Sequence, residues 1–504
     1  MIAFSSPIVD YHALAPELVL AAGLCLVLLV DLFVPDHRRW ITGTISGFVL
    51  LGAVLPVVTL AVWGGDVRDA IGGVGIDGRY VVDNFALVLK ALFLLSGYVV
   101  VLLSTHEMEE KAGYQGEFYV MLLSSVLGMV MMASSRDLVS VFVALEFLSI
   151  PAYMMAAWKK RDRKSNEAGV KYYLLGVFAS AVMLYGMSLL YGIAGSTKLT
   201  AIGAAITLDG DKVGIQVLGV VFVIIGFAFK VSAVPFHTWA PDTYEGAPTP
   251  VTAFLSVASK AAGFVGLVIM VYLAFPLARD VYRPFMWVLA ALTMTIGNLV
   301  ALKQKNLVRM LAYSSVSQGG FILMALAMAY TNGSEESSLR AVLVYLIIYA
   351  ATNLGAFAVV IAVARRTRSA EISSYGGLFT YAPGLTVMMT IFLASLAGIP
   401  PLGGWYAKFG AFRAAVDAGG GWGYSIAIIG AANAVVATAY YITVMREMWM
   451  KPVPENADTS SVKVPASLQA ALAICGVATL AFGVVPGIIA KVGSITDLTG
   501  AFHL

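Results

Sequence analysis

The chain has 504 residues, of which 60% are apolar and only 12% are charged, and its mean hydropathy is +0.86. Soluble globular domains carry about a quarter charged residues, so this composition excludes a soluble protein and indicates one that crosses a lipid bilayer. The formal net charge of +3 does not indicate a basic surface for nucleic acid, because lysines inside apolar segments contribute as much to it as the loops do.

Fourteen apolar segments recur along the chain, each long enough to cross about 30 Å of hydrocarbon as a helix. They are predicted at 14–33, 41–63, 81–103, 117–134, 137–157, 168–194, 214–237, 247–275, 284–302, 306–329, 339–364, 382–412, 424–448 and 466–490. Continuous apolar runs indicate helices, because the strands of a membrane barrel alternate in polarity and are half as long. The predicted fold class is therefore an all-α polytopic membrane protein.

The ends and loops of the chain give its expected orientation. No cleaved signal peptide is expected, because no basic residue precedes the first apolar run, whereas Asp10 and Glu17 are acidic. Cys25 and Cys475 stand singly in apolar segments, so no disulfide, zinc or iron–sulfur site is predicted. The alternate loops that include WKKRDRK, LKQKNLVR and ARRTR hold the larger share of lysine and arginine. The positive-inside rule therefore places these loops in the cytoplasm and both termini outside.

Two stretches, VPFHTWAPD and PPLGGWYAK, share a frame in which a proline precedes a tryptophan by four residues: Pro235 and Trp239, then Pro401 and Trp405. Five predicted crossings separate them, and an odd number reverses direction through the bilayer, so an inverted repeat is predicted. Proline removes a backbone donor and blocks the preceding turn, so each matched span is predicted to be a broken helix. For one proline alone, a kink that helps packing is the alternative.

The predicted organisation follows from this repeat. It consists of an N-terminal three-helix segment at 1–116, a first repeat of helices four to eight at 117–275, an inverted repeat of helices nine to thirteen at 276–450 and a C-terminal helix at 451–504.

Four ionisable residues are predicted near the middle of the membrane. Glu146 lies about nine residues, or roughly 13 Å, into its helix, and Lys260 lies at a similar depth. Lys230 precedes the first break and Lys408 follows the second. A charged residue at a helix centre costs at least ~2.5 to 3.5 kcal/mol. Because one carboxylate cannot neutralise three lysines as static pairs, we interpret these residues as a proton relay. Static ion pairs that join helices are the alternative.

Three further ionisable residues allow more than one interpretation. Lys171, four residues after Glu167 and little more than a turn inside its helix, fits a surface ion pair with a snorkelling stem. His237, just beyond the first break, fits a proton carrier between water and the relay equally as well as a histidine bound by loop carbonyls. Lys90 lies in the third predicted span without an evident partner and is interpreted as a packing or snorkelling residue.

The remaining motif search concerns cofactor sites. No P-loop occurs, no GxGxxG follows a strand, and no histidine pair has haem or metal spacing. We therefore expect no redox centre, metal or nucleotide site in this chain. The energy for moving protons would then come from a gradient or from partner subunits.

The run PFHTWAPDTYEGAPTPVTAFLSVASKAAG, with ALEFLSIPAY upstream and GIPPLGGWYAKF downstream, strongly resembles the antiporter-like membrane subunits of respiratory complex I. The resemblance covers predicted spans four to thirteen closely and the whole chain in span count. Within the family, the phrase YEGAPTPVTAFLS, a lysine at 260 where the larger relatives usually have histidine, and the 504-residue length make the chain most similar to subunit N of the bacterial NADH-quinone oxidoreductase.

The resemblance implies roles for five matched positions. Glu146 matches the glutamate of the fifth helix, and Lys230 matches the lysine of the broken seventh helix that pairs with it. Lys260 matches the connecting residue of the eighth helix, and Lys408 matches the lysine of the broken twelfth helix near the proposed exit. Lys171 matches a sixth-helix lysine implicated in the family.

The function implied by the resemblance is that of a translocase subunit in a bacterial cell membrane, moving protons from the cytoplasm to the outer side when quinone is reduced. FMN, iron–sulfur clusters and quinone would belong to partner subunits. The expected partners are the other membrane-arm subunits, including the larger antiporter-like ones and small membrane subunits, together with the lipid bilayer; no nucleic-acid partner is expected. A stand-alone secondary cation/proton antiporter and a scaffold that spaces other subunits are the alternatives.

Overall fold

The computed structural model describes residues 8–64, 67–72, 78–109, 115–208, 210–454, 460–496 and 498. Within these residues, thirteen helices are long and apolar enough to cross a membrane. Ten of them are single helices: α1 (Ala15–Phe33), α2 (Trp40–Trp63), α3 (Asn84–Glu109), α4 (Gln115–Ser134), α5 (Leu138–Ala156), α6 (Arg163–Ala194), α13 (Leu307–Ala327), α14 (Glu335–Thr367), α18 (Gly420–Met450) and α19 (Ala466–Val484). The other three are α8 (Val213–Lys230) and α12 (Arg279–Ala301), each with one 3₁₀ turn before it, and a composite helix. The composite helix consists of α10 (Thr249–Phe254) and α11 (Lys260–Ile269), each followed by a π-helical turn.

The count is one below the fourteen predicted spans, because the predicted span 382–412 falls on two shorter helices. These are α16 (Pro383–Ala397) and α17 (Gly403–Ala418). Gly398 ends α16 with φ +91°, a left-handed conformation that favours glycine, and cis Pro401 lies in the gap between the two helices. Neither half is long enough alone to count as a crossing.

The first break also lies where the sequence places it. α8 ends at Lys230, and the short helix α9 (Trp239–Gly246) begins nine residues later, after cis Pro235. Ser232 in this gap has φ +59°. The Trp239 indole donates a 3.0 Å hydrogen bond to the Phe229 carbonyl in the last turn of α8, which also accepts from the Ser232 amide at 3.0 Å.

A small amount of β-structure was not predicted. β1 (Ile8–Val9) pairs antiparallel with β3 (Ile71–Gly72), and β2 (Val67–Asp69) pairs with β4 (Val81–Asp83). These short pairs satisfy backbone groups of β2, β3 and β4, which lie between α2 and α3. The described chain is otherwise helical, with the short helices α7 (Leu199–Ala205), α15 (Leu378–Tyr381) and α20 (Pro486–Ile495) beside the long ones.

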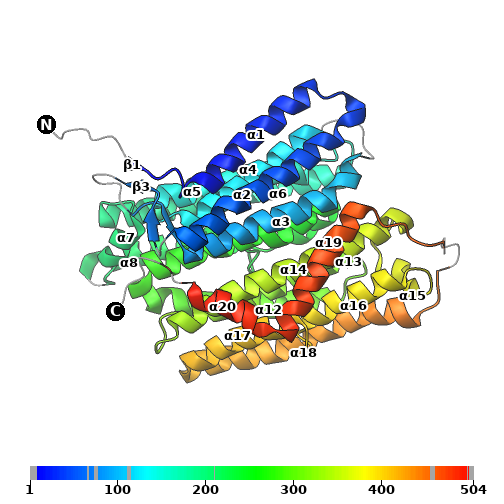
Figure 1. Cartoon of the computed structure of the whole chain (residues 1–504). Coiled ribbons are helices and arrows are strands. Elements are labelled where there is room, and N and C mark those ends of the chain that lie inside the picture. The colour runs from blue at the N-terminus through cyan, green and yellow to red at the C-terminus, as the bar shows by residue number, and fades with distance from the viewer. Residues whose placement is uncertain are drawn as a thin grey trace.

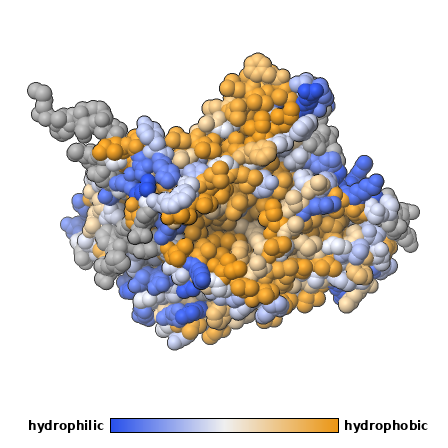
Figure 2. Space-filling view, in the orientation of Figure 1, coloured by the Kyte–Doolittle hydropathy of each residue, from blue (hydrophilic) through white to orange (hydrophobic). Residues whose placement is uncertain are grey.

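The long helices lie side by side, with α1 and α18 on opposite edges of the view in Figure 1. The composite helix at Thr249–Ala274 is completely buried, and α13 and α14 are nearly so. Apolar side chains cover much of the face that Figure 2 shows. Phe48, Phe178, Ile428 and Val435 are among the large apolar side chains that the structure leaves exposed. An apolar exterior of this extent is suited to lipid rather than water. The central helices are therefore the ones shielded from lipid, and Lys260 lies on one of them.

Candidate functional site: three buried lysines and their partners

Lys230 is the last residue of α8 and is only 3% exposed. Its Nζ donates hydrogen bonds to Ser149 Oγ at 2.8 Å and to Tyr172 Oη at 3.4 Å. Gly263 on α11 provides the space for the lysine stem, because a Cβ at this position would lie 2.8 Å from Lys230 Cγ. The partners of this ammonium group are therefore neutral hydroxyls.

Glu146 lies on α5, three residues before Ser149, so the two side chains share one face of that helix. Its Oε1 accepts a 2.5 Å hydrogen bond from Ser180 Oγ on α6. No direct ion pair between Glu146 and Lys230 occurs among the described residues, although the resemblance implies one. The structure instead places the lysine one helical turn further along α5, on Ser149.

Lys260 is 2% exposed and begins α11, directly after a π-helical turn at Leu255–Ser259. A π-bulge shifts the register of a helix and occurs frequently at functional sites. The Lys260 ammonium donates to Ser315 Oγ at 2.6 Å and to the Ser315 carbonyl at 2.9 Å, both on α13. Here too the lysine binds neutral oxygens.

Lys408 lies on α17, beyond the second break, and is 6% exposed. Its Nζ donates to the carbonyl of Ala397, the last residue of α16, at 2.9 Å, and lies 5.0 Å from the centre of the Phe321 ring. A Cβ at Gly398 would lie 2.9 Å from Lys408 Cδ, so the glycine that ends α16 also leaves room for the lysine. The break thus supplies the acceptor for this ammonium group.

A polar stretch of α13 lies between Lys260 and Lys408, and it was missed in the sequence. Gln318, one turn after Ser315, donates to the Leu396 carbonyl at 3.0 Å and to Tyr441 Oη at 3.2 Å, and its amide oxygen accepts from Tyr345. Ser314, Ser315, Ser317 and Gln318 are all buried. The sequence signal was the run YSSVSQGG at 313–320, because clustered polar residues inside a membrane helix mark functional paths.

A small cavity adjoins this stretch on the side of Lys408. Its volume is about 10 Å³, and its lining includes Gln318, Tyr345, Ser395 and Ala407. This volume is at the lower limit for one water molecule. The space between Gln318 and the second break is therefore nearly closed, although polar side chains such as Gln318 and Ser395 take part in its lining.

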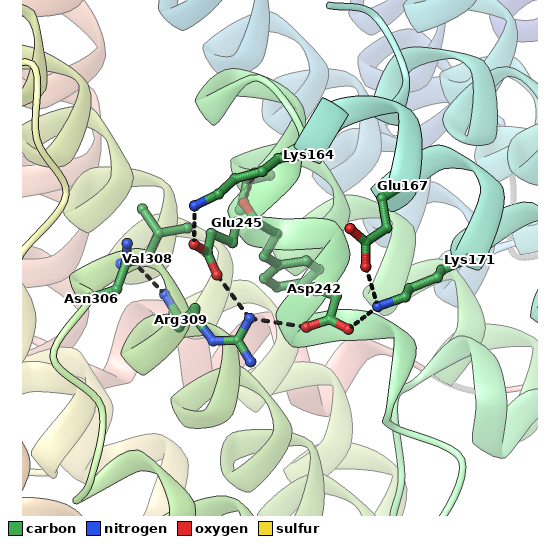
Figure 3. Close-up of polar contacts among 10 residues, drawn as sticks. Lys164, Glu167, Lys171, Asp242, Glu245, Asn306, Val308 and Arg309 are labelled. Atoms are coloured by element: carbon green, nitrogen blue, oxygen red, sulfur yellow. Dashed lines mark hydrogen bonds and ion pairs between the residues drawn. The ribbon is translucent and has the colours of Figure 1, made fainter. Parts of the chain in front are cut away.

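Lys171 belongs to a different group of residues, at the edge of the helical bundle. Its Nζ lies 2.6 Å from Glu167 and 2.7 Å from Asp242, and 41% of its side chain is exposed. Asp242 also binds Arg309 at 2.9 Å, and Arg309 in turn binds Glu245 at 2.8 Å (Figure 3). The sequence predicted the Glu167 pair but not the contact with Asp242.

This ion-pair network connects α6, α9 and α13. Lys164 extends it by binding Glu245 at 2.8 Å, and Asn306 holds the first turn of α13 by accepting from the backbone amides of Val308 and Arg309. Burial raises the pKa of Asp242, but hydrogen bonds from Lys171 and Arg309 outweigh it, so its pKa lies below the usual 3.8. The pKa of Glu245 is lowered in the same way by Lys164 and Arg309.

His237 is partly buried in the segment between α8 and α9. Its Nδ1 is buried and has no hydrogen-bond partner among the described residues, and its ring lies 6.4 Å from that of Tyr313. Burial lowers the pKa of this imidazole, so its neutral form is favoured at neutral pH. The Pro235 carbonyl in the same loop acts on this imidazole as well and raises its pKa, so a loop carbonyl is part of its surroundings.

Lys90 differs from the three lysines above. It is fully buried, and its Nζ lies 2.6 Å from Glu17 Oε1 on α1, where Tyr80 Oη also donates at 2.6 Å. The interpretation as a snorkelling residue without a partner is therefore wrong. The sequence signal was Glu17 itself, an acidic residue at the start of an apolar segment.

Among the described residues, no group of three or more histidine, cysteine, aspartate or glutamate side chains is arranged to hold a metal ion. Besides the buried pair of Lys90 and Glu17, the ionisable residues described above form two groups: three lysines with hydroxyl and carbonyl partners, and the network of ion pairs around Lys171.

Comparison with known proteins gives a consistent family. The transmembrane family model of the NADH:quinone oxidoreductase/Mrp antiporter proteins matches residues 135–432. Subunit N of NADH-quinone oxidoreductase from Trichlorobacter lovleyi is 38% identical over 483 residues, covering 95% of this chain and 96% of that protein. Subunit N from Desulforamulus reducens is 38% identical over 467 residues, covering 92% and 94%.

Solved structures show the same architecture. A chain of respiratory complex I from Thermus thermophilus matches with a TM-score of 0.76 and 29% identity, covering 94% of this chain and 98% of that chain. A chain of the Mrp complex from a Dietzia species matches with a TM-score of 0.84 at 20% identity, covering 96% and 97%, which shows a shared fold. The chain therefore belongs to the NADH:quinone oxidoreductase/Mrp antiporter family, and within it to the antiporter-like subunit N of NADH-quinone oxidoreductase.

Proposed function

We propose that this chain translocates protons from the cytoplasm to the outer side of a bacterial cell membrane, as a subunit of complex I driven by quinone reduction in partner subunits. One observation carries the proposal. Lys230, Lys260 and Lys408 are all buried, and none of them contacts a carboxylate among the described residues.

The physical argument is the cost of an ammonium group without a fixed anion. A buried charge is expensive unless it is paired, and breaking a buried pair costs about 3 to 5 kcal/mol. Lysines that only join helices should each have a carboxylate, as Lys90 has Glu17. Lysines that hold a proton only transiently need polar oxygens that tolerate both the charged and the neutral form. Hydroxyls and carbonyls are of this kind.

The proposed route uses the residues in chain order. Glu146 and Lys230 are connected through one face of α5, and Lys260 reaches Ser315 on α13. The polar stretch of α13 then leads toward the second break, where Lys408 binds the end of α16. Lys171 directly precedes Tyr172, which accepts a hydrogen bond from Lys230. We propose that Lys171 belongs to the relay as well, and that His237 connects the cytoplasmic water to it.

We also propose that the chain contains two inverted repeats, at 117–275 and 276–450, between an N-terminal segment at 1–116 and a C-terminal helix at 451–504. In support, a residue with a left-handed backbone stands three positions before the proline of each break: Ser232 in the first and Gly398 in the second. If α16 and α17 together make one crossing, the chain crosses fourteen times and both termini lie outside.

The proposal assigns the redox chemistry to partners. FMN, iron–sulfur clusters and quinone would be bound by other subunits of complex I, and the larger antiporter-like and small membrane subunits would be the neighbours in the membrane arm. Support comes from the family itself, since the similar solved chain is part of a respiratory complex I.

The test is a Lys260→Met substitution in the complete complex, because methionine keeps an apolar chain of similar length but cannot carry a proton. The complex should assemble and oxidise NADH, while the protons pumped per NADH, measured by dye quenching in inverted vesicles, fall. The control is Lys305→Met, which changes an exposed lysine in the loop before α13. An unchanged proton-to-electron ratio in Lys260→Met would refute conduction through this chain and favour a scaffold.

A further inference from the structure

The seam between α3, α14 and α19 contains a polar cavity of about 610 Å³ near the ends of these helices. Four side chains that line it are basic or can become so: His106, Lys159, Arg365 and Arg368. Glu107 is the acidic residue of the lining, and it lies 3.4 Å from Lys159. The charge of the lining is therefore positive.

The same seam contains an apolar groove of about 350 Å³. It is lined by residues of α3 such as Leu92 and Leu95, of α14 such as Leu354, and of α19 such as Cys475 and Phe482, with α20 closing one side. Figure 2 shows a recess surrounded by apolar side chains in the middle of this face. Almost no polar surface is present in the groove.

The cavity and the groove follow one another along all three helices. On α3, Val99 lines the groove and Leu102 lines the cavity. On α14, Leu354 lines the groove and Ile361 lines the cavity. On α19, which runs in the opposite direction, Ile474 lines the groove and Leu468 lines the cavity. Seven residues of helix span about 10 Å, so the basic cavity lies one or two turns beyond the groove.

We propose that this seam binds one anionic diacyl phospholipid, with its phosphate among Arg365, Arg368 and Lys159 and its acyl chains in the groove. A positive cavity beside an apolar groove matches a molecule that has a phosphate at one end and hydrocarbon at the other. The basic residues belong to loops that the sequence assigns to the cytoplasmic face, where anionic lipid concentrates.

The end of α14 shows which of its arginines can reach a phosphate in the cavity and which cannot. Arg368 ends this helix with φ +50°, a conformation uncommon for a long side chain, and it lines the cavity. Arg366, between the two cavity arginines, instead hydrogen-bonds the Ser460 backbone and side chain and does not line the cavity. Arg366 is therefore a matched control within the same turn.

The experiment uses the complete purified complex and a phosphatidylglycerol that carries a photoactivatable diazirine at the end of one acyl chain. After delipidation and addition of this probe, illumination should label peptides of α3, α14 or α19 that line the groove, as mapped by mass spectrometry. Each basic residue near a membrane surface contributes about 1 kcal/mol, or about fivefold in affinity. The double variant R365Q/R368Q should therefore weaken labelling by up to about 30-fold, whereas R366Q should leave it unchanged.

A second variant keeps the charges and fills the groove instead. Ala351, a partly exposed residue of the lining, is replaced by leucine, and labelling should fall although both arginines remain. Excess unlabelled phosphatidylglycerol should compete, while phosphatidylcholine and inorganic phosphate should not. Competition by inorganic phosphate would show a site for the phosphate group alone, and equal labelling in all variants would show nonspecific lipid; either result overturns the proposal. Cross-linking between the groove and a helix of another subunit, with no lipid label, would overturn it as well.

Discussion

Lys90 and Lys230 are both buried in apolar surroundings, but their partners differ in charge. Lys90 lies 2.6 Å from the carboxylate of Glu17, whereas Lys230 binds the hydroxyls of Ser149 and Tyr172. Composition alone cannot distinguish these two cases, since both residues appear in the sequence as single lysines within apolar runs. The difference arises from a contact between α1 and α3, which are far apart in the sequence.

This difference predicts opposite effects on stability and on pumping. Glu17→Gln removes the anion from a buried pair and should destabilise the fold by about 3 to 5 kcal/mol, because Lys90 would remain charged and unpaired. Scanning fluorimetry of the purified complex should show this as a lower unfolding temperature. Proton pumping per NADH in the complexes that remain folded should be unchanged.

The control is Glu167→Gln, which removes an exposed member of an ion pair and should have little effect. Equal unfolding temperatures for Glu17→Gln and wild type would contradict the assignment of Lys90 as a structural lysine. A loss of pumping without a loss of stability would place Lys90 in the proton path instead.

The residue-level predictions from the sequence were partly successful. Insertion cost placed Lys230, Lys260 and Lys408 in the membrane interior, and the structure confirms their burial. Their partners could not be predicted, because Ser149 and Ser315 are ordinary small polar residues until the packing of helices brings them to an ammonium group. Asp242 could have been noticed in the sequence. When VPFHTWAPD is aligned with PPLGGWYAK on the shared proline and tryptophan, Asp242 stands at the position of Lys408.

At the scale of elements, α9 is a helix of eight residues that depends on its neighbours. An isolated helix of this length is unstable in water, so its position must come from contacts. Asp242 and Glu245 on α9 bind Lys171 and Lys164 on α6 and Arg309 on α13. We infer that these ion pairs hold the segment after the first break in place.

The lowered pKa values of Asp242 and Glu245 give a pH dependence with a definite sign. A carboxyl whose pKa is lower in the folded state stabilises the fold above its unfolded pKa, and this contribution is lost as pH falls through the folded value. The unfolded values are about 3.8 and 4.5, so the network should be intact at neutral pH and weaken below about pH 4.

The measurement compares wild type with Asp242→Asn by scanning fluorimetry between neutral and acidic pH. The variant should unfold at a lower temperature at neutral pH, and its disadvantage should shrink as pH falls below about 4, because wild type loses the same charge there. Asp280→Asn is a suitable control, since the Asp280 side chain is 67% exposed where it pairs with Arg279 and Arg283 near the start of α12. A constant difference at every pH would mean that Asp242 acts through packing rather than through its charge.

For the whole molecule, hydropathy predicted a polytopic helical protein but could not decide how a broken span is built. The predicted span 382–412 reads as one apolar run, whereas the structure ends α16 at Ala397 and starts α17 at Gly403. The short β-pairs near the N-terminal helices were also missed, because two- and three-residue strands have no periodicity to detect. The sequence predicted the apolar helices and the burial of the lysines well, because both depend on the free energy of transfer from water to lipid.

An experiment on the whole chain can distinguish a pumping subunit from a stand-alone exchanger. If the energy for transport comes from quinone reduction in partners, this chain purified alone and reconstituted in liposomes should leave an imposed pH or sodium gradient intact. An internal pH-sensitive dye measures this directly, and a sodium–proton ionophore added at the end shows that the gradient was present. Dissipation that disappears in Lys230→Met would contradict the proposal, because it would show that the buried lysines exchange ions without a partner. An intact gradient together with pumping by the complete complex would mean that the lysines need an external charge movement to release their protons, as expected for ammonium groups held by neutral oxygens.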